Sequence, residues 1–152
     1  LKLEQVSDGE YLPYVELVRE DGTSTGMAFH GVPEGHEFSG FILSFYNASG
    51  HGQPIDEKLL EQIKAIDKDV NIKVLVSLSC TMCPDLVIAA QRIASLNDHV
   101  TTHIYDAGLY PDLRTKYRVM SVPCLVINDT EVSFGKKKLS ELLEYLRSIN
   151  AI

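Results

Sequence analysis

Residues 71–85, NIKVLVSLSCTMCPD, are the most informative part of this 152-residue chain. The first nine of them form a short apolar run rich in β-branched side chains, which predicts a buried strand. A helical pattern of apolar residues follows over residues 83–97. The two cysteines of CTMC therefore fall where a buried strand turns into a helix.

Strands and helices alternate after this stretch. Apolar runs predict strands over residues 100–106, 124–128 and 131–134, and helical spacing predicts helices over residues 109–118 and 139–149. A further helix, N-capped by Asp56, is expected before the first strand. From that strand onward the order is β-α-β-α-β-β-α, which is the order of a thioredoxin-like unit. We place this unit at residues 53–152.

An internal repeat links the beginning of the chain to its end. Pro123 opens a predicted hairpin that a helix follows, and Pro13 opens a second hairpin that leads into a helix over residues 35–47. We therefore interpret residues 1–52 as the back end of another thioredoxin-like unit, without a redox site. The predicted fold class is α/β, with tandem thioredoxin-like folds, of which the first is incomplete and the second carries the CxxC.

Composition and charge exclude several classes of function. Hydrophobic residues make up 45% of the chain, enough for a core, but no apolar run of about 18 residues predicts a membrane span. Residues 1–70 carry 13 acidic and 5 basic side chains, which argues against nucleic-acid binding. No signal peptide is visible, and three cysteines are too few for a disulfide scaffold. Instead of structural disulfides, we expect a reactive thiol pair in the reducing cytoplasm.

The position of the cysteine pair suits thiol–disulfide exchange. A thiol at a helix N-terminus faces unpaired N–H groups and the positive end of the helix dipole, and both stabilise the thiolate. We expect Cys80, at the exposed cap, to attack, and Cys83, a turn later and facing the sheet, to resolve the mixed disulfide. The Val122-Pro123 bond comes directly before the strand predicted over residues 124–128, and we expect it to be cis. The backbone of Val122 is then expected to pair with an extended segment of the substrate.

Other interpretations of the CxxC stay open at this level. The pair could be inert core cysteines, or the chain could be a binding module whose acidic first half docks a partner while the CxxC senses redox state or holds Cu(I). A zinc site lacks further ligands nearby, and we predict no metal. A stand-alone protein disulfide oxidoreductase that acts on many proteins is a further possibility.

Three segments carry a resemblance to a known family: residues 78–85, residues 119–123 and Gly35-His36-Glu37-Phe38. They resemble the N-terminal domain of the alkyl hydroperoxide reductase flavoprotein subunit, over about residues 11–149. The resemblance implies tandem thioredoxin-like folds that take part in peroxide detoxification and cell redox homeostasis. Electrons would pass from a flavin-containing reductase domain through the CxxC to the disulfide of a peroxiredoxin-like partner. The chain has no GxGxxG motif, so FAD and NAD(P)H are expected on a separate domain or partner and not on this chain.

The resemblance also implies roles for single residues. It makes Cys80 and Cys83 the redox pair, Pro123 the cis-proline, and Glu37 an acid near the disulfide that moves a proton. Such a carboxylate needs partial burial and a raised pKa. Without the family, Glu37 is better explained as a solvated acid at a helix N-terminus, where such acids are common. The expected catalytic residues are therefore Cys80, Cys83, Glu37 and Pro123, and the expected substrate contacts are Thr81, Met82 and Val122.

Three residues at two places depart from the family pattern. Thr81-Met82 stands where His-Asn is usual between the cysteines, which affects the expected redox potential. Cys124 follows the proline where a small apolar residue is usual. Either Cys124 packs within its strand, or it lies near Cys80 and forms a regulatory disulfide.

Overall fold

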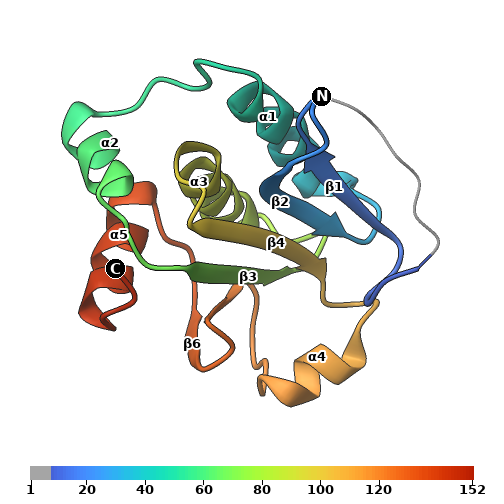
Figure 1. Ribbon diagram of the computed structural model, residues 1–152. Coiled ribbons are helices and arrows are strands. Elements are labelled where there is room, and N and C mark those ends of the chain that lie inside the picture. The colour runs from blue at the N-terminus through green and yellow to red at the C-terminus, as the bar shows by residue number, and fades with distance from the viewer. Residues whose placement is uncertain (1–7) are drawn as a thin grey trace.

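Six strands form one mixed sheet in the computed structural model, which describes residues 8–152 (Figure 1). In chain order they are β1 (Tyr14–Val18), β2 (Ser24–His30), β3 (Val70–Val76), β4 (Val100–Asp106), β5 (Cys124–Ile127) and β6 (Glu131–Phe134). Across the sheet their order is β1-β2-β4-β3-β5-β6. The three central strands β2, β4 and β3 are parallel, and an antiparallel strand continues the sheet on each side of them.

The helices divide between the two faces of this sheet. They are the 3-10 turn η1 (Gly35–Glu37), α1 (Phe38–Ala48), α2 (Glu57–Lys64), α3 (Cys83–Leu96), α4 (Pro111–Lys116) and α5 (Leu139–Ser148). Figure 1 shows α3 lying along the middle of one face with α1, α2 and α5 around it, whereas α4 lies on the other side. Each face has its own buried apolar cluster, the larger one under α3 and the smaller one next to α4.

Every predicted helix and strand in the described residues is present, and the differences lie at their ends. The strand expected to reach Ser79 ends at Val76, because the chain then turns and the N–H of Cys80 donates to the Ser77 carbonyl at 2.9 Å. The helix expected over residues 109–118 is confined to α4. Pro111 begins it, and Arg118 has a left-handed conformation that ends it.

The two hairpins share more than their order of elements. The Leu12-Pro13 and Val122-Pro123 peptide bonds are both cis, so the sequence prediction for Pro123 is confirmed. In each hairpin the proline carbonyl accepts a hydrogen bond from the glycine that follows the second strand, Gly31 at 2.7 Å and Gly135 at 3.1 Å. This match supports the division of the chain into two related units, which stays a prediction. The sheet itself is continuous, since β2 pairs directly with β4.

Parallel pairing places the loops that follow β2, β3 and β4 at one edge of the sheet. The carboxyl ends of β2, β3 and β4 point the same way, so the loops that follow them lie together. The CxxC is in the loop after β3, and the Val122-Pro123 segment returns beside it before β5. Within residues 8–152, no helix is long and apolar enough to cross a membrane.

Candidate active site

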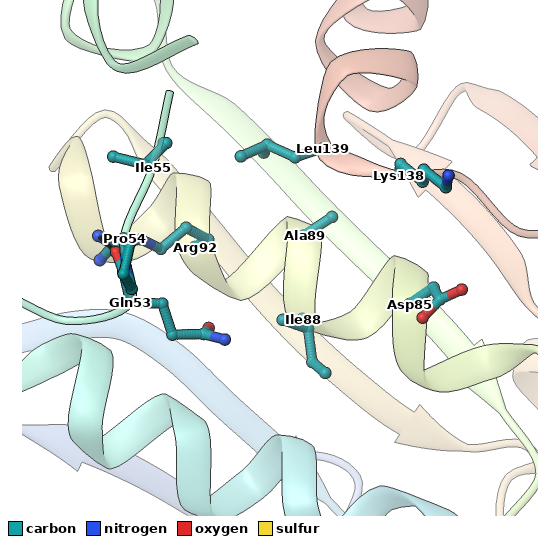
Figure 2. A pocket seen from close by; sticks show the side chains of 9 residues that line it. All are labelled: Gln53, Pro54, Ile55, Asp85, Ile88, Ala89, Arg92, Lys138 and Leu139. Carbon is teal, nitrogen blue, oxygen red and sulfur yellow. Dashed lines mark hydrogen bonds between the residues drawn. The ribbon is translucent and has the colours of Figure 1, made fainter. Parts of the chain in front are cut away.

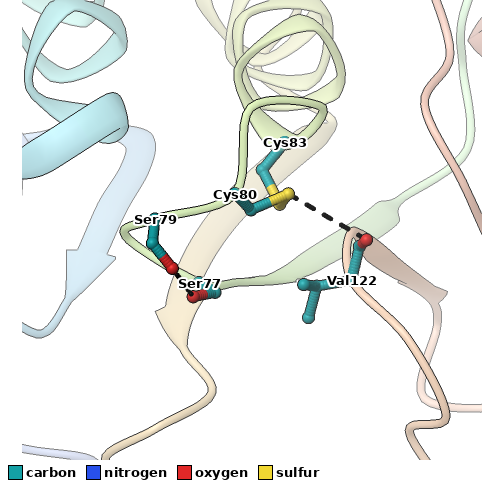
Figure 3. Close-up of a disulfide and its surroundings, with 5 residues drawn as sticks. All are labelled: Ser77, Ser79, Cys80, Cys83 and Val122. Carbon is teal, nitrogen blue, oxygen red and sulfur yellow. Dashed lines mark hydrogen bonds between the residues drawn. A yellow bond between two sulfur atoms is a disulfide. The ribbon is translucent and has the colours of Figure 1, made fainter.

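Cys80 and Cys83 form a disulfide at the N-terminus of α3 (Figure 3). Their Cα atoms are 5.6 Å apart. Cys83 is the first residue of α3 and is fully buried, whereas Cys80 is partly exposed in the loop before it. Pro84 occupies the first turn of the helix, where a missing N–H leaves no hydrogen bond unmade. A thiolate from another protein can therefore approach the sulfur of Cys80 but not that of Cys83.

The loop around Pro123 lies against this disulfide. The carbonyl oxygen of Val122 is 4.0 Å from Sγ of Cys80, and Figure 3 shows the two groups facing each other. A groove of about 310 Å³ continues from this point, between residues 107–108, residues 119–122 and Arg114. An extended segment of another protein can lie in this groove with a sulfur next to Cys80.

Two exposed methionines lie on the surface near the disulfide, among polar side chains such as Ser79 and Thr81. Thr81 and Met82 lie between the two cysteines, and Met82 is 50% exposed. Met120, in the loop before Val122, is 84% exposed and lines the groove. We call Met82, Met120 and Val122 the docking rim. The sequence-predicted contacts Thr81, Met82 and Val122 are thus brought together, while Met120 was missed because nothing in its local sequence distinguishes it from a loop residue.

Glu37 is completely buried, so its interpretation as a solvated helix-end acid is wrong. Neither carboxyl oxygen has a hydrogen-bond partner among the described residues. Burial without such a partner disfavours the charged form and raises the pKa of Glu37 from its ordinary 4.5 to about 7. A carboxyl group with this pKa can both accept and release a proton near neutral pH.

Close packing of η1 and α1 places Glu37 against the active-site helix. The N–H of His36 donates to the Leu78 carbonyl at 3.0 Å, which ties η1 to the chain two residues before Cys80. Oε2 of Glu37 lies 3.9 Å from the point that a Cβ on Gly40 would occupy, and Cγ1 of Val87 lies 3.6 Å from that same point. Val87 is on the same face of α3 as Cys83, one turn along.

Cys124 packs in its strand, which was one of the two interpretations of it. It is completely buried in the apolar cluster next to α4, with Leu75, Tyr105 and Leu113, whereas Cys83 belongs to the cluster on the other face of the sheet. Burial raises the pKa of the Cys124 thiol to about 11. Cys124 is therefore a core residue in this structure, in a different apolar cluster from Cys83.

Two further hollows lie away from the cysteines. One, of about 280 Å³, is bounded by α3, residues 53–55 and the start of α5, and Figure 2 shows Ile88 and Ala89 along its floor with Arg92 at one end. The other, of about 360 Å³, is on the α4 side of the sheet and contains His30 and His103, whose Nε2 and Nδ1 atoms are 2.9 Å apart. The local sequence gives no sign of this histidine pair, because the sheet joins residues from distant parts of the chain.

The part of the chain that the structure describes holds no cluster of three or more histidine, cysteine, aspartate or glutamate side chains suited to a metal ion. Burial lowers the pKa of His103 to about 4 and also lowers that of His30, so both imidazoles are neutral at physiological pH. Among the described residues, the Cys80–Cys83 pair is therefore the candidate redox centre.

Comparisons with known proteins agree with this geometry. Residues 70–147 match a family model described as thioredoxin domain. The chain is 35% identical over 127 residues to the alkyl hydroperoxide reductase F subunit of Escherichia coli (84% of this chain, 24% of the relative). It is 31% identical over 131 residues to a Bacillus subtilis protein named NADH dehydrogenase (86% of this chain, 26% of the relative). The chain thus spans about a quarter of the length of these curated relatives.

Solved structures give the same result. The NTD_N/C domain of alkylhydroperoxide reductase AhpF from Enterococcus faecalis superposes with a TM-score of 0.85 at 41% identity, covering 90% of this chain and 66% of that one. A protein disulfide oxidoreductase from Aeropyrum pernix superposes with a TM-score of 0.79 at 26% identity, covering 92% and 60%. The resemblance predicted from the cysteine, Val-Pro and Gly-His-Glu-Phe segments is confirmed at the level of sequence and fold.

Proposed function

The chain belongs to the thioredoxin domain family and is a thiol–disulfide oxidoreductase, and from this premise we propose that it passes electrons from a flavin-containing reductase to the disulfide of a peroxiredoxin-type partner. One observation carries the proposal: a partly exposed Cys80 at a helix N-terminus, disulfide-bonded to a buried Cys83. FAD and NAD(P)H belong to the reductase, on a separate domain or protein, and the exchange takes place in the cytoplasm.

Reduction of the partner begins with the Cys80 thiolate. The unpaired N–H groups and the dipole at the start of α3 stabilise its charge. The thiolate attacks one sulfur of the partner disulfide, an S–S bond forms between the two proteins, and the other partner sulfur leaves as a thiolate. Thr81, Met82 and the backbone of Val122 contact the partner segment while it lies in the groove.

Resolution then uses the buried side of the site. The Cys83 thiol gives its proton to the Glu37 carboxylate, and its sulfur attacks Cys80 to close the internal disulfide and release the partner as a dithiol. A carboxyl group with a pKa of about 7 suits this step, because it is partly ionised at neutral pH. Two electrons leave the chain in each cycle, and the flavin-linked dithiol restores them.

Peroxide-dependent NADH oxidation in the presence of a flavin-containing reductase and a peroxiredoxin tests the proposal. Cys80→Ser should abolish the transfer, and Cys83→Ser should accumulate a mixed disulfide between Cys80 and the peroxiredoxin that reducing agent releases. Transfer that persists in Cys80→Ser would reject the proposed route.

A stand-alone protein disulfide oxidoreductase is the second candidate, favoured by the likeness to the Aeropyrum pernix structure. The reduction potential of the Cys80–Cys83 pair separates the two. A value of roughly −270 mV, as in thioredoxin, suits an electron donor, whereas a value of roughly −180 to −120 mV suits an oxidant or isomerase. Equilibration with glutathione or dithiothreitol followed by thiol trapping measures it.

A further inference from the structure

The sulfur atoms of this protein differ sharply in exposure. The chain has three methionines and three cysteines. Met27 is 1% exposed in the core, whereas Met82 is 50% and Met120 is 84% exposed. In the oxidised protein Cys80 and Cys83 are joined in a disulfide, and the Cys124 thiol is completely buried. The thioethers of Met82 and Met120 are therefore the readily oxidised sulfur atoms that solvent reaches.

Both exposed methionines lie on the docking rim. Met82 stands between the two cysteines, and Met120 lines the groove that starts at Val122, whose carbonyl faces Cys80. Methionine is flexible and polarizable, and it adapts to apolar surfaces of different shape. A partner segment that lies in this groove contacts Met120, and its disulfide approaches Cys80 beside Met82.

We propose that Met82 and Met120 are reversible oxidation sites at which a hydroperoxide lowers the affinity of the chain for its disulfide partner. The docking role of the rim in this proposal rests on the proposed function. The O–O bond of the hydroperoxide breaks and one oxygen atom bonds to the methionine sulfur. The sulfur loses two electrons, and the hydroperoxide is reduced to an alcohol, or to water in the case of hydrogen peroxide.

Oxidation changes the rim and leaves the thiol chemistry alone. A sulfoxide is polar and strongly hydrated, so an apolar contact with the partner must be made at the cost of removing that water. Cys80, Cys83 and Glu37 are not altered, and the rate of the chemical step should stay the same. A methionine sulfoxide reductase reverses the change, since two thiols become a disulfide and water while the sulfoxide returns to a thioether.

The experiment compares the three methionines within one protein. The oxidised chain is incubated with millimolar hydrogen peroxide, digested, and analysed by mass spectrometry for added oxygen at each methionine. KM and kcat for reduction of a peroxiredoxin disulfide are then measured before oxidation, after it, and after treatment with methionine sulfoxide reductases. The double variant Met82→Leu/Met120→Leu serves as the matched control, because leucine keeps the volume and cannot be oxidised.

We expect oxygen at Met82 and Met120 with Met27 unmodified, a rise in KM of roughly five-fold, and an unchanged kcat. The reductases should restore KM, and the double variant should keep its KM after peroxide. Equal oxidation of Met27 would overturn the proposed sites, and an unchanged KM, or an equal rise in the double variant, would overturn their docking role. Failure of the untreated protein to reduce any disulfide would overturn that role together with the proposed function, while the oxidation map still tests the two sites.

Discussion

Replacing Glu37 by glutamine should remove a large part of the pH dependence of folding. The pKa of this buried carboxyl group is about 7, against an ordinary 4.5, so between these pH values the folded protein holds a proton that the unfolded chain has released. This bound proton stabilises the folded state relative to the unfolded chain. Its contribution to the free energy of unfolding is complete below pH 4.5 and is lost as the pH rises through 7. At about 1.4 kcal/mol per pH unit, the loss amounts to about 3 kcal/mol.

Urea unfolding of the oxidised protein measures this difference. Wild type and Glu37→Gln are compared at about pH 4.5 and about pH 8.5, and the change in unfolding free energy of one is subtracted from that of the other. Subtraction removes the contribution of groups that titrate in both proteins, such as His103. Glutamine has the shape of the protonated acid, so the two proteins should differ little at the lower pH. At the higher pH the variant should gain about 3 kcal/mol over wild type.

Parallel pH profiles for the two proteins would refute this reasoning, because they would mean that Glu37 is as well solvated in the folded chain as in the unfolded one. The rate of thiol–disulfide exchange gives an independent measure. Between pH 6 and 9, Glu37→Gln should slow the exchange without unfolding the protein, since glutamine cannot accept the proton of Cys83. An unchanged rate across this range would exclude Glu37 from proton transfer even if its burial is correct.

Three further predictions concern single residues. Gly35→Ala should cost about 1–3 kcal/mol in urea unfolding, because φ is +57° and a Cβ would lie 2.5 Å from the Leu78 carbonyl oxygen. Gly22→Ala, with φ of +85° and open space around it, is the matched control and should cost less. Asp56→Ala should cost about 1 kcal/mol in the same assay, since the Asp56 carboxylate accepts from two N–H groups at the start of α2. In the reduced folded protein a thiol reagent should modify Cys80 quickly and Cys124 only after unfolding, and mass spectrometry of native labelling that finds Cys124 would contradict its buried placement.

Local patterns were sufficient for the redox centre itself. A β-branched run followed by helical spacing fixes the strand-to-helix junction, and the CxxC at that junction is confined to one end of a helix whatever the rest of the chain does. The cis bond at Pro123 was predictable because a Val-Pro pair comes directly before a later strand of the same thioredoxin-like unit. Local sequence alone made Glu37 a first-turn acid exposed to water. Its burial depends on α1 packing closely against α3 at Gly40, where the neighbouring side chains of Val87 and Ile88 are nearly fifty residues further along the chain, and no local pattern contains such a contact.

The geometry of the site shows how the first segment of the chain reaches the loop that carries the two cysteines. β2 pairs with β4, and the loop after β2 is thereby held at the same sheet edge as the CxxC. The bond from His36 to the Leu78 carbonyl then fixes η1 to the active-site loop, and α1 covers the carboxyl group of Glu37 against α3. A thioredoxin-like unit that began after residue 52 would retain both cysteines but would have no buried carboxyl group from this segment. The two thiols and the acid proposed to serve them are therefore contributed by different segments, and the continuous sheet is what keeps them in register.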